Sequence, residues 1–171
     1  MNGTAAGWLQ FALLFAALAV CYVPLGDYIA YIFTTEKDWR IERAFYRLIG
    51  IDRSADTKWS TYARSVLAFS AVSVLFLYGM MRLQHSLFGF VGQPMAAVPQ
   101  NTSWNTAVSF VTNTNWQNYA GEATLTYISQ MSGLVVQQFM SAAVGLVVAI
   151  AMIRGFTRSR TDKLGNFWVD V

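Results

Sequence analysis

Three long apolar segments constrain this chain more than any other feature of its sequence. They cover about residues 8–33, 65–81 and 128–153 of a 171-residue chain in which only 12% of the residues are charged. That charged fraction is about half of what soluble domains carry. As helices, segments of this length can cross the roughly 30 Å hydrocarbon core of a bilayer. We therefore predict an all-α integral membrane protein with three transmembrane helices.

The first apolar segment, Trp8–Phe33, contains Pro24 and Gly26 near its far end. Proline removes one helical hydrogen bond and its ring clashes with the preceding turn, so we expect a kink or a break there. A secretory signal peptide is an alternative for this segment. Such a peptide begins with a basic region, and no Lys or Arg precedes Lys37.

The basic residues gather in two places. Of the twelve Lys and Arg, seven lie between residues 37 and 64 and four between 154 and 163, while Arg82 stands alone. The positive-inside rule then places segments 34–64 and 154–171 in the cytoplasm and the N-terminus outside. This clustering assigns the basic residues to topology and to anionic lipid, and we expect no nucleic-acid partner.

Segment 34–64 contains a stretch, Trp39–Gly50 (WRIERAFYRLIG), whose apolar residues recur at helical spacing. Gly50 is well placed to end a helix, since glycine readily adopts the left-handed cap conformation. The stretch predicts an amphipathic helix on the inner membrane surface. Docking against a partner subunit is compatible with the same pattern.

The third apolar segment carries small and amide side chains. Its small residues are Gly133, Ser141, Gly145 and Ala149. Such a face lets helices approach closely. Its glutamines are Gln130, Gln137 and Gln138. These glutamines could either form hydrogen bonds to neighbouring helices or lie beside an aqueous path.

A shorter apolar stretch, Ser103–Val111, reaches only about 13 Å as a helix and cannot span a bilayer. It is followed by Thr112–Asn118, which offers hydroxyl and amide groups without a charge. Irregular backbone is tolerated at membrane depth only where protein buries it or water lines it. We predict a re-entrant pore helix and filter loop between the second and third spans. A capped outer loop with Asx turns is the alternative.

Neutral carbonyl oxygens suit a monovalent cation that must lose its hydration shell and still leave. Turning successive carbonyls toward one axis often requires left-handed backbone angles, which Asn tolerates best after Gly. Asn113 and Asn115 are therefore candidates for these positions. Glu122 is a candidate either for a charge at the outer mouth or for a cap at the start of the third span.

Residues 105–139, NTAVSFVTNTNWQNYAGEATLTYISQMSGLVVQQF, resemble the first pore repeat of the KdpA family. These are the potassium-translocating subunits of bacterial Kdp potassium-transporting P-type ATPases. Further resemblance lies in PLG at Pro24–Gly26, in Gln84 and His85, in FTR at Phe156–Arg158 and in the C-terminal LGNFWVDV. The resemblance covers nearly the whole chain.

The resemblance implies a potassium-channel-like fold, in which an extra N-terminal helix (1–33) precedes a helix–pore loop–helix repeat (65–153). It implies that the filter residues Thr112, Asn113, Thr114 and Asn115 coordinate K⁺ mainly through carbonyls, with support from Gln117. The expected partners are a P-type ATPase catalytic subunit, which uses the ATP and Mg²⁺, and small accessory subunits, all in the bacterial plasma membrane. We find no P-loop or aspartyl-phosphate motif in this chain, and we expect no cofactor in it.

Members of that family are much longer than 171 residues. One repeat supplies one wall of a pore that needs four. A fragment, a truncated product and a tetramerising single-repeat cation channel are therefore all compatible with the sequence, and we favour the first two. A non-conducting membrane assembly or regulatory subunit is the alternative from another functional class.

Overall fold

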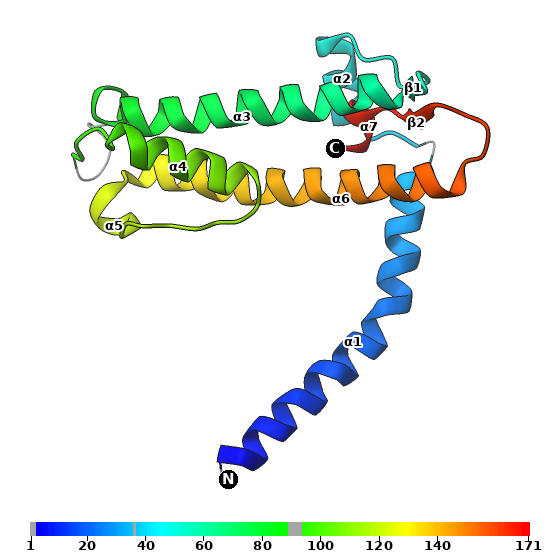
Figure 1. Cartoon of the computed structure of the whole chain (residues 1–171), viewed down its shortest axis with the longest axis horizontal. Helices are drawn as coiled ribbons and strands as arrows, with labels where there is room; N and C mark the ends of the chain where they lie inside the picture. The colour runs from blue at the N-terminus through cyan, green and yellow to red at the C-terminus, as the bar shows by residue number, and fades with distance from the viewer. Residues whose placement is uncertain (1–2, 36, 89–93) are drawn as a thin grey trace. The chain divides into compact units, whose positions relative to one another are not determined.

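The chain is described by a computed structural model over residues 3–35, 37–88 and 94–171. The predicted segments 1–33, 34–64 and 65–153 each include residues outside these ranges. Two units make up the chain, Met1–Gly50 and Ile51–Val171. In chain order the elements are α1 (Gly3–Thr34), α2 (Arg40–Ile49), β1 (Thr57–Lys58), α3 (Trp59–Phe88), α4 (Gln100–Val111), α5 (Gly121–Thr124), η1 (Ser129–Val135), α6 (Val136–Thr157), β2 (Lys163–Gly165) and α7 (Phe167–Asp170) (Figure 1).

Within the residues that the structure describes, three helices are long and apolar enough to cross a membrane. They cover Gly3–Thr34, Trp59–Leu87 and Ser129–Thr157, and the last joins η1 to α6. Each contains one of the three apolar segments of the sequence. The prediction of an all-α protein with three spanning helices is confirmed. The first and second spans extend beyond both ends of their apolar segments, and the third continues past its segment as far as Thr157.

The first unit begins with α1, which runs through Pro24 without interruption. Of the predicted kink or break, the break is therefore excluded. The ribbon of α1 bends part-way along its length (Figure 1). Transmembrane helices tolerate proline because local adjustments of the helix and neighbouring polar groups satisfy the backbone carbonyl that it leaves free.

The second element of this unit, α2, confirms the helix predicted between Trp39 and Gly50. Its start is held by the Glu42 carboxylate, which accepts a hydrogen bond from the Trp39 backbone N–H at 2.8 Å. Its end lies at Gly50, whose φ of 68° is left-handed and favours glycine.

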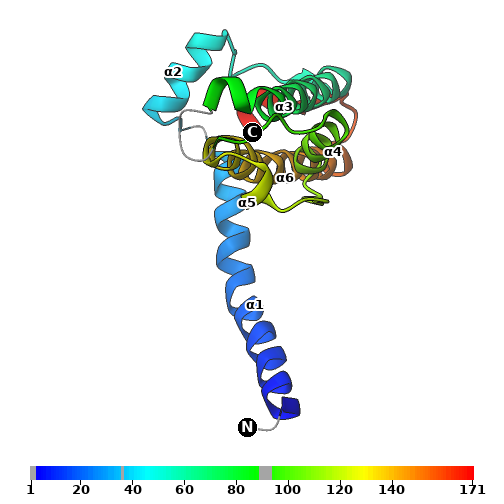
Figure 2. The same ribbon diagram turned by 90° about the vertical axis from the view of Figure 1, so that its left-hand side faces the viewer.

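The second unit has its core where α4 packs against α3 and the start of the third span (Figures 1 and 2). Phe110 and Ala107 of α4 meet Leu77 and Met81 of α3 there, together with Leu134 of η1. We call this end of the unit, where α4 and α5 lie, the loop end. The opposite end, with β1, β2 and α7, is called the strand end.

The third span begins as a π-helix, η1, before it continues as α6. Gly133 in η1 lies against α3, since a Cβ placed on it would come within 2.9 Å of Leu77 Cδ1. Of the predicted small-residue face, Gly133 and Ser141 are buried, whereas Gly145 and Ala149 are exposed. Close helix approach within this unit therefore uses only the half of that face nearest the loop end.

At the strand end, two short strands join parts of the sequence that we had treated as separate segments. β1 pairs antiparallel with β2, with Thr57 opposite Gly165 and Lys58 opposite Lys163. β2 contacts both α3 and α6. The buried ring of Phe167, in α7, packs edge-on against Tyr62 with ring centroids 5.9 Å apart. The C-terminal segment thus links the ends of the second and third spans.

A buried ion pair holds this linkage together. Arg154 Nη2 of α6 donates to Asp170 Oδ1 of α7 at 3.0 Å, and the Tyr62 hydroxyl donates to Asp170 Oδ2 at 2.9 Å. The Arg154 and Asp170 side chains are only 18% and 8% exposed. A second pair, Lys58 with Asp162, is exposed, and the hydrogen bond from Lys58 lowers the pKa of Asp162.

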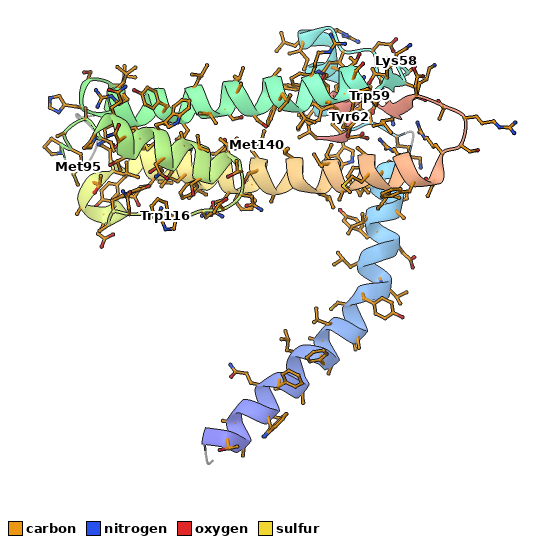
Figure 3. The ribbon with its side chains drawn as sticks, viewed as in Figure 1. Lys58, Trp59, Tyr62, Met95, Trp116 and Met140 are labelled. Carbon is orange, nitrogen blue, oxygen red and sulfur yellow. The ribbon has the colours of Figure 1, made fainter. Side chains whose placement is uncertain are left out.

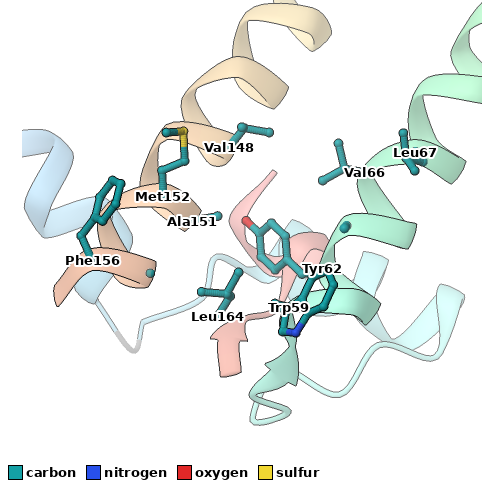
Figure 4. A pocket seen from close by; sticks show the side chains of 11 residues that line it. Trp59, Tyr62, Val66, Leu67, Val148, Ala151, Met152, Phe156 and Leu164 are labelled. Carbon is teal, nitrogen blue, oxygen red and sulfur yellow. The ribbon is translucent and has the colours of Figure 1, made fainter. Parts of the chain in front are cut away.

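An apolar pocket of about 600 Å³ opens between α3 and α6 near the strand end (Figure 4). Val66 and Leu67 line it from α3, Val148 and Met152 from α6, and Leu164 from β2. Because its walls are almost entirely hydrocarbon, this pocket has no ligands for an ion.

Candidate functional site

The candidate site is the segment that follows α4, and the anchoring of α4 fixes where this segment lies. Ahead of the helix, the Val98 N–H donates to Met81 O at 3.2 Å, and Arg82 Nη1 donates to Val98 O at 2.6 Å. Ser103 Oγ also donates to Val98 O, at 3.1 Å. These bonds tie the start of α4 to α3 at the loop end.

From this anchor α4 runs toward the middle of the third span. Its twelve residues reach about 18 Å. Just beyond the helix, Asn113 Oδ1 accepts a hydrogen bond from Ser141 Oγ at 3.3 Å. Ser141 lies twelve residues into the span that begins at Ser129, again about 18 Å along it. The tip of the segment therefore lies well inside the length of the spanning helices.

Past this tip, three consecutive backbone N–H groups turn toward Ser109 of α4. Thr114 N and Asn115 N donate to Ser109 O at 2.9 and 3.2 Å. Trp116 N donates to Ser109 Oγ at 2.6 Å. One serine near the end of α4 therefore satisfies three donors of a segment without regular secondary structure.

The same bonds fix where the carbonyl groups point. In a planar trans peptide the C=O points opposite to the N–H of the next residue. The carbonyls of Asn113, Thr114 and Asn115 consequently face away from α4, on the exposed side of the segment. Successive carbonyls can share one side because Asn113 and Asn115 have φ values of 58° and 56°. The left-handed backbone predicted for these two asparagines is confirmed.

The chain then returns to the loop end. Trp116 lies on this returning stretch (Figure 3). At its end, Gly121 O accepts a hydrogen bond from Gln130 Nε2 at 3.3 Å, and Thr124 O accepts one from Gln84 Nε2 at 2.9 Å. The segment thus leaves the loop end as a helix and comes back to it as extended chain.

The other predicted site residues lie on either side of these carbonyls. The Thr112 hydroxyl donates to Val108 O at 2.9 Å and lies 3.0 Å from the Thr114 hydroxyl. Gln117 is exposed, and its Nε2 lies 3.4 Å from the Tyr119 hydroxyl. Thr112, Asn113, Thr114 and Asn115 therefore come together, with Gln117 at their edge.

Glu122 is exposed in the first turn of α5, apart from the other site residues. At the start of the third span, Thr126 Oγ1 accepts a hydrogen bond from the Ser129 N–H at 3.2 Å. Both roles that we gave Glu122, a negative charge near the mouth of the site and a cap at the start of the third span, stay predictions.

Sequence reasoning missed Ser109, gave Ser141 only a role in helix packing, and assigned no role to Gln84. Gln84 is completely buried, and its side-chain amide bonds to three backbone groups of the loop end. A role for Gln84 could have been predicted, because this residue is among those that carried the family resemblance. The indication was weaker for Ser109, which is a small polar residue in an apolar helix shortly before the uncharged stretch.

The glutamines of the third span differ in their surroundings. Gln130 Nε2 donates to the backbone carbonyls of Gly121 and Leu125. Gln137 is 6% exposed, whereas Gln138 is exposed. Gln130 therefore shows hydrogen bonding to a neighbouring segment, one of the two roles left open by the sequence.

The oxygen atoms of this site are neutral. Over residues 3–35, 37–88 and 94–171, no group of three or more His, Cys, Asp or Glu side chains comes together that could hold a metal ion. The carbonyls after α4 therefore offer the coordination that suits a monovalent cation rather than a tightly held divalent one.

Residues 12–171 match the family model described as potassium-transporting ATPase A subunit, KdpA. The chain belongs to this family. Similar curated proteins from Mycobacterium avium (strain 104) and Mycolicibacterium smegmatis are 52% and 54% identical over all 171 residues. One from Streptomyces griseus is 52% identical over the same length. All three are named potassium-transporting ATPase potassium-binding subunit.

The match covers all of this chain but only 30–31% of those KdpA relatives. The chain therefore spans about a third of the length of the curated relatives it matches. The resemblance drawn from residues 105–139 and from the other motifs is confirmed by this membership.

Proposed function

We propose that this chain forms one wall of a potassium path and binds K⁺ through the carbonyl oxygens of Asn113, Thr114 and Asn115. The observation that supports this most is the direction of these three carbonyls, which face the exposed side of the segment together. Ser109 accepts from the N–H groups on the other side of the same three peptide bonds, those of Thr114, Asn115 and Trp116, so the carbonyls stay aligned without a bound ion. Such preorganisation lowers the cost of replacing the water shell of the ion.

A single wall provides ligands on one side of the ion only. The remaining ligands would come from further segments, either of a longer polypeptide or of other chains. The names of the relatives support potassium as the cargo. Glu122, exposed at the loop end, would raise the local concentration of cations near the mouth of the path.

The family resemblance supports a further proposal about the membrane setting and the partners of this chain. We infer that the chain lies in the bacterial plasma membrane, with its N-terminus outside and segments 34–64 and 154–171 in the cytoplasm. The distribution of basic residues supports this orientation. ATP hydrolysis, with its Mg²⁺, would belong to a P-type catalytic partner, and small accessory subunits would complete the importer.

The substitution Gln117→Arg tests this function in the complete transport complex. A positive charge about 10 Å from a bound cation costs roughly 1.7 kcal/mol at an effective dielectric constant of about 20, which is more than tenfold in affinity. We expect the apparent potassium affinity of transport to fall at least about tenfold.

Asn101→Arg is the matched control, because Asn101 is exposed at the start of α4, remote in sequence from the carbonyls. It places the same charge at the loop end, where α4 begins, and we expect affinity to change little. Equal losses in both variants would point to a general charge effect. Unchanged affinity in Gln117→Arg would contradict the assignment and favour a subunit that assembles the complex without conducting.

A further inference from the structure

The helix α2 carries a continuous apolar face that none of the proposed potassium chemistry uses. The exposed fractions of its members are 79% for Ile41, 55% for Phe45, 82% for Leu48 and 44% for Ile49. With 3.6 residues per turn, Ile41, Phe45 and Leu48 fall in one row. We call these four residues the α2 apolar face.

The other side of the same helix is basic. Arg40, Arg43 and Arg47 are all exposed, and their spacing of three and four residues puts them in a second row away from the apolar face. Long arginine side chains can reach sideways while their stems lie along an apolar layer. The helix therefore combines a hydrophobic face with three cations that can reach the edges of that face.

The link to α1 limits where α2 can lie. α1 ends at Thr34 and α2 begins at Arg40, so six residue steps connect them. Even fully extended, this link spans only about 20 Å. Because α1 is long and apolar enough to cross a bilayer, α2 must begin close to the membrane surface at which α1 ends.

We propose that α2 lies in the headgroup layer of the membrane and binds anionic phospholipids, with its apolar face among the acyl chains and Arg40, Arg43 and Arg47 on the phosphates. Charge complementarity favours a lipid surface that carries net negative charge. The alternation of large apolar and basic side chains over ten residues is typical of helices that lie flat in this layer.

The assignment goes beyond ion binding, since it gives segment 34–64 a lipid site of its own. Each arginine close to an anionic surface changes the ratio of docked to undocked helix by about fivefold. Docking would therefore depend on the headgroup composition of the membrane and weaken at high salt.

Site-directed spin labelling of the chain in lipid vesicles tests this placement. Cys21 is the one cysteine of the sequence, so Cys21→Ser provides the background. Labels are then attached through Leu48→Cys on the apolar face, Arg43→Cys on the basic row and Leu14→Cys in α1 as a reference inside the bilayer. Collisions with oxygen report lipid contact, and collisions with a neutral nickel chelate report water contact.

In vesicles of phosphatidylcholine with phosphatidylglycerol, we expect the label at position 48 to favour oxygen over the nickel chelate, as the label at position 14 does. The ratio of the two collision rates should be at least about threefold higher at position 48 than at position 43. Low collision rates with both reagents at position 48 would mean contact with protein. Frequent collisions with the nickel chelate there would mean exposure to water. Either result would overturn the proposal.

Two further experiments distinguish binding to anionic lipid from docking through the apolar face alone. One replaces phosphatidylglycerol by phosphatidylcholine, and the other combines Arg40→Gln, Arg43→Gln and Arg47→Gln. In each arm we expect the nickel collision rate at position 48 to rise at least about twofold. An unchanged rate in both arms would overturn the role of the three arginines in binding anionic lipid.

Discussion

Asn113 and Asn115 carry the backbone geometry on which the proposed ion site depends. Both adopt left-handed φ values, and this lets three successive carbonyls share one side of the segment. Asparagine tolerates this conformation because its short polar side chain can bond locally, whereas most residues pay about 1–2 kcal/mol for it. The Asn113 side chain also anchors the segment to the third span, since its Oδ1 accepts a hydrogen bond from the Ser141 hydroxyl.

Asn115 allows the backbone to be tested separately from the side chain. Asn115→Ala should disturb the alignment of the carbonyls, because the left-handed backbone conformation is unfavourable for alanine by about 1–2 kcal/mol. Asn115→Gly should keep it, because glycine adopts positive φ freely. If the site binds K⁺, exchange of Na⁺ for K⁺ should raise the melting temperature of the unsubstituted chain. We expect this rise to persist in the glycine variant and to shrink in the alanine variant. The same rise in both variants would show that backbone angle at this position does not matter.

Gly133 provides a residue-level test of packing. A Cβ there would lie 2.9 Å from Cδ1 of Leu77, which is completely buried and cannot easily move. Overpacking of this kind costs about 1–3 kcal/mol. Gly133→Ala should therefore lower the free energy of unfolding in detergent by this amount.

Gly145→Ala is the matched control on the same span, since a Cβ at Gly145 would meet nothing within 4 Å. It should be neutral or stabilising by up to about 1 kcal/mol, through helix propensity. Equal destabilisation by both variants would contradict the close approach of η1 to α3.

Among the elements, the strand end shows how two spans are held in place. The buried pair of Arg154 and Asp170, with the Tyr62 hydroxyl, joins α6 and α7 to the start of α3. The strands β1 and β2 add a second connection, because their hydrogen bonds join the residues just before α3 to the C-terminal segment. Because β2 contacts both α3 and α6, the C-terminal segment fixes the separation of these helices at this end.

The same substitution at two aspartates measures this linkage. Asp170→Asn leaves the Arg154 charge buried without its partner, and breaking a buried pair in this way costs about 3–5 kcal/mol. Asp162→Asn removes an exposed pair with Lys58, which is worth at most about 1 kcal/mol. Chemical unfolding of both variants should show this difference. Similar, small effects would mean that the buried pair does not hold the strand end together.

At the level of the whole molecule, local patterns in the sequence predicted more than long-range ones did. The three spans follow from apolar length, and α4 from a stretch too short to cross a bilayer. The left-handed asparagines followed from the steric tolerance of one residue type. In contrast, the pairing of Thr57–Lys58 with residues 163–165 joins positions more than one hundred residues apart, and no periodicity reveals it.

Three further features lay beyond sequence reasoning. The residues of η1 carry no pattern that distinguishes a π-helix from an α-helix. Pro24 predicted either a kink or a break in α1, and the sequence could not decide between them, because the outcome depends on how the freed backbone carbonyl is satisfied in the folded chain. The convergence of three N–H groups on Ser109 likewise required the geometry of the chain beyond α4.

Anomalous X-ray diffraction from crystals of the protein grown with thallium(I) in place of K⁺ would test the proposed ion site most directly. We expect an anomalous peak beside the carbonyl oxygens of Asn113, Thr114 and Asn115, on the side of the segment away from α4. Thallium peaks at other positions only, or these carbonyls turned toward Ser109, would contradict the assignment of this segment as a wall of the potassium path.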